Sequence, residues 1–279
     1  MNYLKIAPLL LLACSVPCAS WAQETPAPTE EPEVQVNPRP KETDKASRQL
    51  IQNFLAVTGG KQAHINLRNI VAKGTIEEAG KTKKFELIKT QDGKRKLTFS
   101  WRLLGREYVE VTSFDGVNAW TQKLSPKEFP AKPYGGRDAQ HFINQRWFIQ
   151  PLVVPLKAAY DFKYQGADKV GGRPAHVVVG YGKKDERTWF YFDKETFLLT
   201  RWGGLGTIAG VEEYLDYRAT RFAKVNGVLL PKQIDLLVEG SAFGTITFDS
   251  ITPKVDLDTK IFYTPIDKTP VLRQRPVAQ

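Results

Sequence analysis

Apolar and polar residues alternate one by one through most of the chain from about residue 69 onward. In the segment 96–103 every even position is polar and every odd position is apolar, so Phe99 and Trp101 share one dry face. The run 85–90 precedes it across Gln91-Asp92-Gly93-Lys94, and Asp-Gly between two such runs is a strong hairpin signal. Further strand candidates, separated by turn residues, are 108–114, 118–122, 175–181, 188–193, 197–202, 211–222, 227–239 and 243–251. The short spacing predicts an antiparallel meander, not βαβ units.

Two segments have helical periodicity instead. Thr43 or Asp44 can cap a helix that Gly59-Gly60 ends, with one apolar face made by Leu50, Ile51, Phe54 and Leu55. A second helix is predicted from Asp138, as its cap, to Gln150, followed by a Pro-punctuated apolar stretch at 151–156. This second helix either packs on the sheet or forms a lid over a hydrophobic concavity.

The first 22 residues have the features of a cleaved secretory signal peptide. Lys5 is followed by the apolar run 6–13 and by Ser20-Trp21-Ala22, which places small residues before a cleavage site. The alternative is a lipoprotein signal, in which Leu11-Leu12-Ala13-Cys14 would make Cys14 the acylated anchor. We expect a periplasmic protein in either case.

The remaining chain divides by composition. Residues 23–42 are rich in Pro and Glu and lack aromatics, which is typical of a flexible linker. We expect one folded domain at 43–267 and a flexible C-terminal tail at 268–279. Both cysteines, Cys14 and Cys18, lie in the predicted signal, so a chain cleaved after it has no disulfide or cysteine-bound metal.

The charge of the chain favours anionic partners. The sequence has 40 Lys and Arg against 30 Asp and Glu, a formal net charge of +10. Basic residues gather around the Asp92-Gly93 hairpin: Lys81, Lys83, Lys84, Lys94, Arg95, Lys96, Arg102 and Arg106. Alternation places the aromatic residues opposite Lys96 and Arg102, so we expect no nucleic-acid surface. A solvated sheet face is the first interpretation, and contact with an anionic membrane or an envelope protein is the second.

Residues typical of catalysis are sparse. The three histidines have no metal-ligand spacing, and we expect no metal and no cofactor. The glycine-rich segment 204–210 precedes a strand candidate, so it indicates a hairpin connection and not a dinucleotide loop. Glu212 and Asp216 share a strand face and form the least poor catalytic pair. We therefore expect no catalytic residue and no enzyme.

Aromatic residues are unusually dense in the predicted strands and in the second helix. One wet-faced sheet does not need so many, so a core or an acyl-chain groove must take some of them. The candidates for a hydrophobic groove or its lid are Phe99, Trp101, Trp120, Phe142, Trp147, Phe148, Trp189, Tyr191 and Trp202.

Several phrases together resemble the outer-membrane lipoprotein-sorting protein family, related to the LolA/LolB-like periplasmic carriers. They are 54–60, 67–70, FDGVNAW (114–120), VGGRPAHVV (170–178), YFDKETFLL (191–199), NGVLLP (226–231) and 261–265. The resemblance implies a mainly β fold, an incomplete antiparallel barrel of about 11 strands, with helices covering a concave side that holds acyl chains.

These observations favour a periplasmic, non-enzymatic binding protein, monomeric, whose partner is a lipid or a lipidated protein. The first alternative is an envelope interaction or sensor module with a filled core. The second is a secreted enzyme acting on glycans, which would need two carboxylates about 5–10 Å apart across an open cleft.

Overall fold

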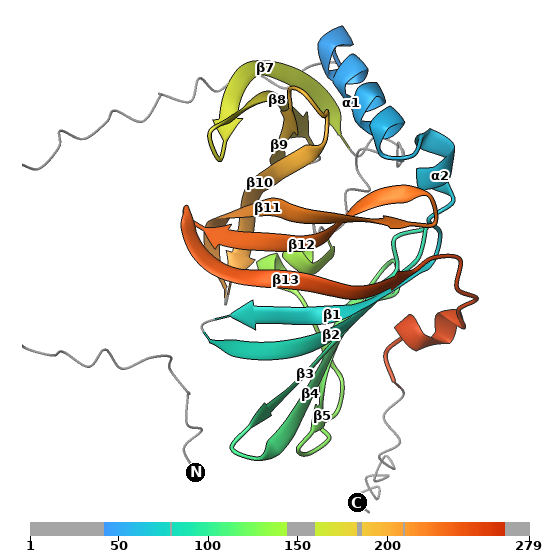
Figure 1. Ribbon diagram of the computed structural model, residues 1–279. Helices are drawn as coiled ribbons and strands as arrows, with labels where there is room; N and C mark the ends of the chain where they lie inside the picture. Colours follow the sequence, from blue (N-terminus) through green and yellow to red (C-terminus); the bar gives the residue numbers. More distant parts are fainter. Residues whose placement is uncertain (1–41, 79, 144–159, 183–185, 209, 266–279) are drawn as a thin grey trace, which may run out of the picture. The chain divides into compact units, whose positions relative to one another are not determined.

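Thirteen strands pair into one antiparallel sheet in the part of the chain that the structure describes (Figure 1). The computed structural model describes residues 42–78, 80–143, 160–182, 186–208 and 210–265, which all belong to one compact unit, 39–279. In sheet order the strands are β6 (Lys132–Pro133), β5 (Ala119–Ser125), β4 (Arg106–Phe114), β3 (Arg95–Leu103), β2 (Lys81–Lys89), β1 (Ile70–Glu78), β13 (Ser241–Thr252), β12 (Val228–Val238), β11 (Val211–Val225), β10 (Leu199–Ile208), β9 (Arg187–Asp193), β8 (Arg173–Tyr181) and β7 (Asp161–Val170).

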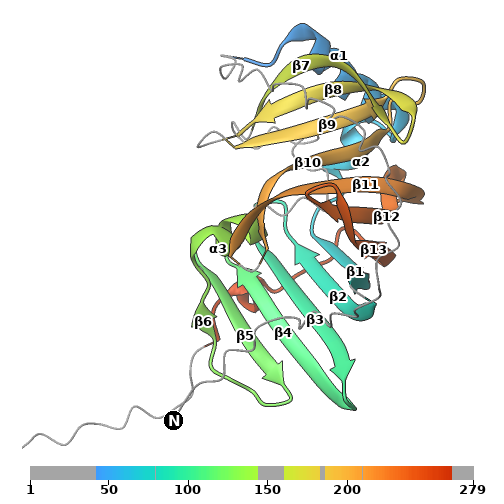
Figure 2. The ribbon, with the colours of Figure 1, turned by 90° about the vertical axis from the view of Figure 1, so that its left-hand side faces the viewer.

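The sheet is a meander interrupted once, because β1 and β13, the first and last strands, pair at its centre. β6 and β7 are its two edges, so the barrel stays open, as the resemblance implied (Figure 2). The strand count exceeds the expected 11, and the strands that no candidate range covered are β1 and these two edges. β6 has two residues, and β7 contains a register shift between Tyr164 and Gly166, so neither has a clear alternation in sequence.

Two short helices precede the sheet. α1 (Lys45–Val57) begins at its predicted cap, since the Asp44 side chain accepts a hydrogen bond of 2.7 Å from the backbone N–H of Ser47. Asp44 Oδ2 also accepts from the backbone N–H of Tyr164 at 2.7 Å, which ties the start of the helix to β7. α2 (Lys61–Ile65) follows the turn at Gly59-Gly60.

α3 (Gly136–Ile143) differs from its prediction at the start. It begins two residues before Asp138, so Asp138 lies in its first turn and is not its cap. Residues 144–150, the rest of the predicted helix, and the apolar stretch 151–156 lie outside the described residues. So do the predicted signal peptide, all but residue 42 of the predicted linker, and the predicted C-terminal tail.

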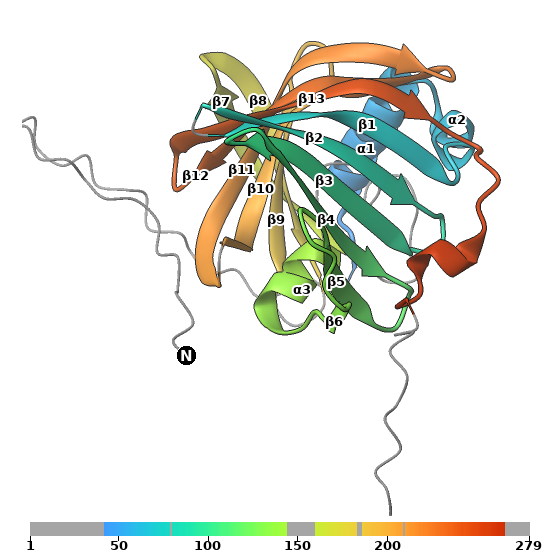
Figure 3. The ribbon, with the colours of Figure 1, turned by 90° about the horizontal axis from the view of Figure 1, so that it is seen from below.

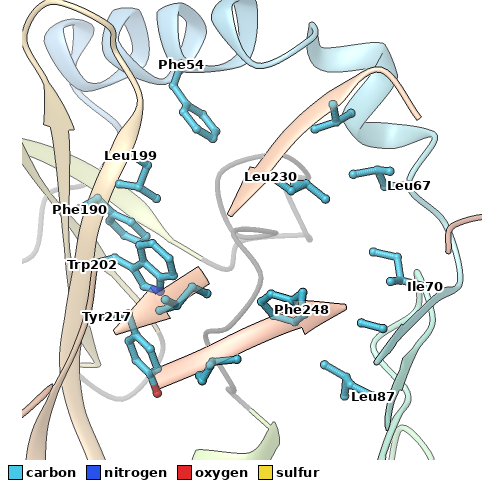
Figure 4. Packing of buried hydrophobic residues seen from close by; sticks show 14 of the residues in the cluster. Phe54, Leu67, Ile70, Leu87, Phe190, Leu199, Trp202, Tyr217, Leu230 and Phe248 are labelled. Atoms are coloured by element: carbon cyan, nitrogen blue, oxygen red, sulfur yellow. The ribbon is translucent and has the colours of Figure 1, made fainter. Parts of the chain in front are cut away.

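One face of the sheet, the inner face, carries the main core. Figure 3 shows α1 and α3 on the concave side of the curved sheet. Under α1, Phe54 packs edge-on against Phe192 at 5.8 Å, and the Trp202 and Tyr217 rings stack at 5.9 Å (Figure 4). The α1 stripe and the inner strand positions therefore form one apolar cluster.

The predicted strand is present as β3, and Phe99 and Trp101 share one face of it, although burial alternates clearly only over residues 95–98. Phe99 lies opposite Phe85 of β2, and Trp101 lies opposite Tyr108 of β4, whose ring it stacks at 5.4 Å. Both aromatic residues of β3 are half-buried and face inward with Leu97.

The glycine-rich segment is mostly a strand and not a hairpin connection. Gly204 and Gly206 lie within β10 and pair with β11, and the turn is made by Gly210 with φ of +84°. A Cβ added at Gly206 would lie 2.8 Å from Nδ1 of His141 on α3. Glycine at this position therefore lets α3 approach the inner face.

Candidate hydrophobic groove

A cavity of about 420 Å³, the α3 cavity, lies between α3 and the inner face of the sheet. This volume is within the range of small-molecule sites, roughly 300–1,000 Å³. Its apolar and aromatic lining comes from α3 and from strands β3 and β10–β13: Leu97, Phe99, Phe142, Ile208, Leu215, Tyr217, Leu236 and Phe243. The cavity therefore offers mainly apolar and aromatic contacts to an occupant.

Three contacts hold α3 over this cavity. The Phe142 ring is buried and meets the Tyr134 ring at 6.4 Å. Nη1 of Arg95, on β3, donates a hydrogen bond of 3.2 Å to the backbone oxygen of Phe142. On the solvent side, Arg137 of α3 pairs with Glu212 of β11 at 3.3 Å. These contacts connect α3 to β3 on one side of the cavity and to β11 on the other.

The inward positions of β3 form a continuous apolar row, the β3 stripe: Leu97, Phe99, Trp101 and Leu103. The first two line the cavity, and the last is exposed at the β3–β4 hairpin. Leu104 follows at the tip of that hairpin, 94% exposed, between Arg102 and Arg106. The stripe therefore leads from the cavity to an apolar, basic hairpin tip.

The rest of the cavity wall is polar. Oδ1 of Asp138 is buried and has no hydrogen-bond partner among the described residues. Burial raises the pKa of the Tyr134 hydroxyl, and the neighbouring Asp138 carboxylate raises it further. Glu78 lines the same space and pairs with Lys83 at 3.1 Å.

The structure brings four of the proposed groove residues together on the concave side. Phe99 and Phe142 line the α3 cavity, and Trp101 continues the same stripe outward. Trp202 also faces inward, but it is fully buried in the core beside Tyr217 and not in the cavity.

Three others lie on the outer face of the sheet. Trp189 and Tyr191 alternate with Phe190 and Phe192, which take the inner positions of β9. The Arg201 guanidinium covers the Tyr191 ring at 4.5 Å. Alternation along β9 predicts that Trp189 and Tyr191 lie on the face opposite to Phe190 and Phe192. The sequence does not indicate which of the two faces is covered by the helices.

Trp120 is buried on the outer face by a different element. The short 3₁₀ helix η2 (Thr259–Phe262) covers the Trp120 side chain. Nε1 of Trp120 donates a hydrogen bond of 2.8 Å to the backbone oxygen of Phe262. Trp147 and Phe148, the remaining candidates, lie outside the described residues.

The two carboxylates of the weak catalytic pair, Glu212 and Asp216, form ion pairs with different arginines. Asp216 is buried on the outer face and accepts from Nε of Arg201 at 2.9 Å and from Arg218 at 3.3 Å. Glu212 pairs with Arg137 of α3. In the described ranges, no three or more His, Cys, Asp or Glu side chains gather as a metal site would require. The helices of those ranges also include none with the length and hydrophobicity to cross a bilayer.

Sequence reasoning missed two buried basic residues, Lys89 and Arg95. Both were counted with, or lie beside, the basic cluster of the Asp92-Gly93 hairpin. Strand alternation could have identified them, because every second residue of a strand lies on the same face. Lys89 follows the inward-facing Phe85 and Leu87 on β2, and Arg95 precedes the inward-facing Leu97 on β3.

No family model matches this sequence, and no curated protein does. Among solved structures, a LolA superfamily protein from Nitrosomonas europaea superposes with a TM-score of 0.50 at 9% identity, over 77% of this chain and 96% of its own. The described chain has a LolA-like fold. A DUF1329 family protein from Desulfovibrio piger (TM-score 0.49, 15% identity, 77% and 96%) is also similar. So is a domain from Vibrio parahaemolyticus assigned to the outer membrane lipoprotein-sorting proteins (0.48, 12%, 77% and 94%). At 9% identity the likeness to the Nitrosomonas europaea protein concerns the fold, and it confirms that part of the resemblance.

Proposed function

We propose that this protein is a periplasmic carrier that holds an acyl chain, of a lipid or of a lipidated protein, in the α3 cavity. The observation that carries the proposal is the cavity itself, with its apolar lining and its continuation along the β3 stripe. Burial of an acyl chain gains about 0.8 kcal/mol per CH₂, so such a site needs no catalytic group.

The hairpin tip supports contact with an anionic membrane. The Leu104 side chain is exposed to solvent, so it gains no free energy from burial in the folded chain. Arg102 and Arg106 flank it. Apolar insertion beside cationic side chains is the combination that binds anionic bilayers. The β3 stripe would then connect the bilayer surface to the cavity.

A second candidate, an envelope interaction module with a filled core, is favoured by the inner face under α1. There the packing of Phe54, Phe192 and Trp202 is complete, and each side chain is at most 2% exposed. A protein partner would in that case bind an outer surface, and the cavity would stay empty.

Equilibrium binding of dodecanol to the delipidated full chain distinguishes the two. Phe99→Glu places a carboxylate in the cavity, and we expect its affinity for dodecanol to fall about tenfold or more because an unpaired buried charge is unfavourable. Ser100→Glu, the next residue on the outer face opposite Lys84, is the matched control and should bind like the unaltered chain. Absence of dodecanol binding by the unaltered chain would contradict the carrier proposal.

A further inference from the structure

Two basic side chains are buried next to each other on the inner face. They lie beyond Leu97, at the end of the β3 stripe that is away from the exposed hairpin tip. Lys89 of β2 is 7% exposed and Arg95 of β3 is 8% exposed. They are direct partners in the β2–β3 register, and both point inward with Leu87 and Leu97. We refer to these two side chains as the cation pair.

No carboxylate neutralises the cation pair in the part of the chain that the structure describes. The nearby Asp92 accepts hydrogen bonds from Thr90 and Lys94 instead. Arg95 donates to the backbone oxygen of Phe142 at 3.2 Å and to that of Gly93 at 3.5 Å, both uncharged acceptors.

Burial of the cation pair lowers the pKa of both side chains. Burial lowers the pKa of the Lys89 ammonium well below its usual value, and the charge of Arg95 lowers it further. Burial alone lowers the pKa of Arg95 to about 10. Two buried like charges with no counter-charge among the described residues are unfavourable, and a bound anion would relieve both.

The cation pair is also placed to act together with the α3 cavity. Leu97, which lines the cavity, is the next inward residue after Arg95, about 7 Å along the strand. Phe142, which also lines the cavity, accepts the Arg95 hydrogen bond. An acyl chain in the cavity could therefore extend its head group to the cation pair without leaving the inner face.

We propose that Lys89 and Arg95 bind the anionic head group, a carboxylate or a phosphate, of an amphiphile whose tail occupies the α3 cavity. This rests on the proposed function and narrows its ligands from acyl chains in general to anionic ones. An ammonium and a guanidinium side by side supply charge-assisted donors to either oxyanion.

The test compares head groups on one tail. Dodecanoate, dodecyl phosphate and dodecanol are titrated into the delipidated full chain by calorimetry, with inorganic phosphate as the tail-free probe. We expect at least one anionic amphiphile to bind about tenfold or more tightly than dodecanol, and inorganic phosphate to bind much more weakly than dodecyl phosphate. Which anion binds tighter identifies the head group.

Lys89→Met removes the buried charge and keeps the length of the side chain. We expect it to lose the preference for the anion while dodecanol binds within about twofold of the unaltered chain. Lys84→Met is the matched control, because Lys84 lies on the same strand but is exposed on the outer face. It should leave all affinities unchanged. Lys89→Gln repeats the test with a polar side chain should the methionine variant fail to fold.

The outcomes separate the two proposals. Equal binding of anion and alcohol by the unaltered chain, or an unchanged preference in both Lys89 variants, overturns the head-group site and leaves the carrier function standing. Inorganic phosphate binding as tightly as dodecyl phosphate overturns the amphiphile. Failure of all three amphiphiles to bind overturns the carrier function itself.

Discussion

The inner face of the sheet is packed solid beneath α1 and hollow beneath α3. α1 buries Ser47, Leu50, Phe54 and Leu55, and its apolar residues join the main core, whereas the described part of α3 buries Ala139 and Phe142. The strands of both regions have the same kind of alternation. Between the described part of α3 and the sheet, about 420 Å³ is left unfilled.

This comparison assigns different roles to aromatic residues that look alike in sequence. Phe54 and Trp202 belong to the filled region and contribute to stability. Phe99 lines the cavity of the hollow region, Trp101 continues the same row along β3, and both side chains are half-buried. Stability and ligand binding should thus respond to different substitutions.

The largest expected effect is a stability contrast between two phenylalanines. Phe54→Ala removes a ring that is 1% exposed and packed against Phe192, so we expect the free energy of unfolding to fall by about 3–5 kcal/mol. Phe99→Ala, at the cavity, should cost about 1 kcal/mol because the ring is only partly buried. Urea unfolding of both variants measures the difference. Equal losses would mean that the α3 region is as tightly packed as the α1 region.

The second effect is acid sensitivity confined to the α1 region. His64 is buried beside Phe54, and its Nε2 lies 2.7 Å from Thr58 Oγ1. Burial lowers the pKa of His64 to about 4 from 6.5, so the folded state favours the neutral ring. The stability that this provides is complete above pH 6.5 and is lost as the pH falls toward 4, by about 2 to 3 kcal/mol.

The pH effect is isolated by comparison with His64→Gln, which can still donate to Thr58 but does not titrate. Unfolding free energies at pH 7 and pH 4 give the change for each protein. The unaltered chain should lose about 2 to 3 kcal/mol more than the variant over this range. Identical pH dependence of the two would show that His64 is not the titrating group.

The smallest effect concerns the open end of the hollow region. Leu104→Glu removes the exposed apolar tip and adds a negative charge, so we expect binding to vesicles containing phosphatidylglycerol to fall about tenfold. Val117→Glu is the control, because Val117 is 82% exposed but lies at the β4–β5 turn, at the other end of β4. Sedimentation with vesicles compares the two. A similar loss in both variants would indicate general charge repulsion instead of tip insertion.

Much of the fold could be predicted from local patterns. The β3 strand, the Asp92-Gly93 hairpin and the Asp44 cap each depend on residues that are neighbours in sequence, and the structure has all three. The edge strands β6 and β7 could not be predicted, because one is two residues long and the other changes register.

The candidate site could be predicted only in part, because alternation separates two faces without saying which one a helix covers. Trp189 and Tyr191 have the same sequence character as Phe190 and Phe192, yet they lie outside. Trp120 is buried by η2, which is 139 or more residues away along the chain. Arg95 and Lys89 lie in sequence among exposed basic residues and were not recognised as buried. Each is two positions from an inward-facing leucine, Leu97 or Leu87, and therefore lies on the same face of its strand.

The central claim is that an acyl chain lies under α3 and not elsewhere, and photo-crosslinking tests it most directly. The delipidated full chain is irradiated with a dodecanol analogue that carries a diazirine at the end of its tail, and the modified peptides are identified by mass spectrometry. We expect modification within 95–103 or 134–143, and we expect excess dodecanol to suppress it. Modification concentrated in 45–57 or 187–202, or modification that dodecanol does not suppress, would contradict it.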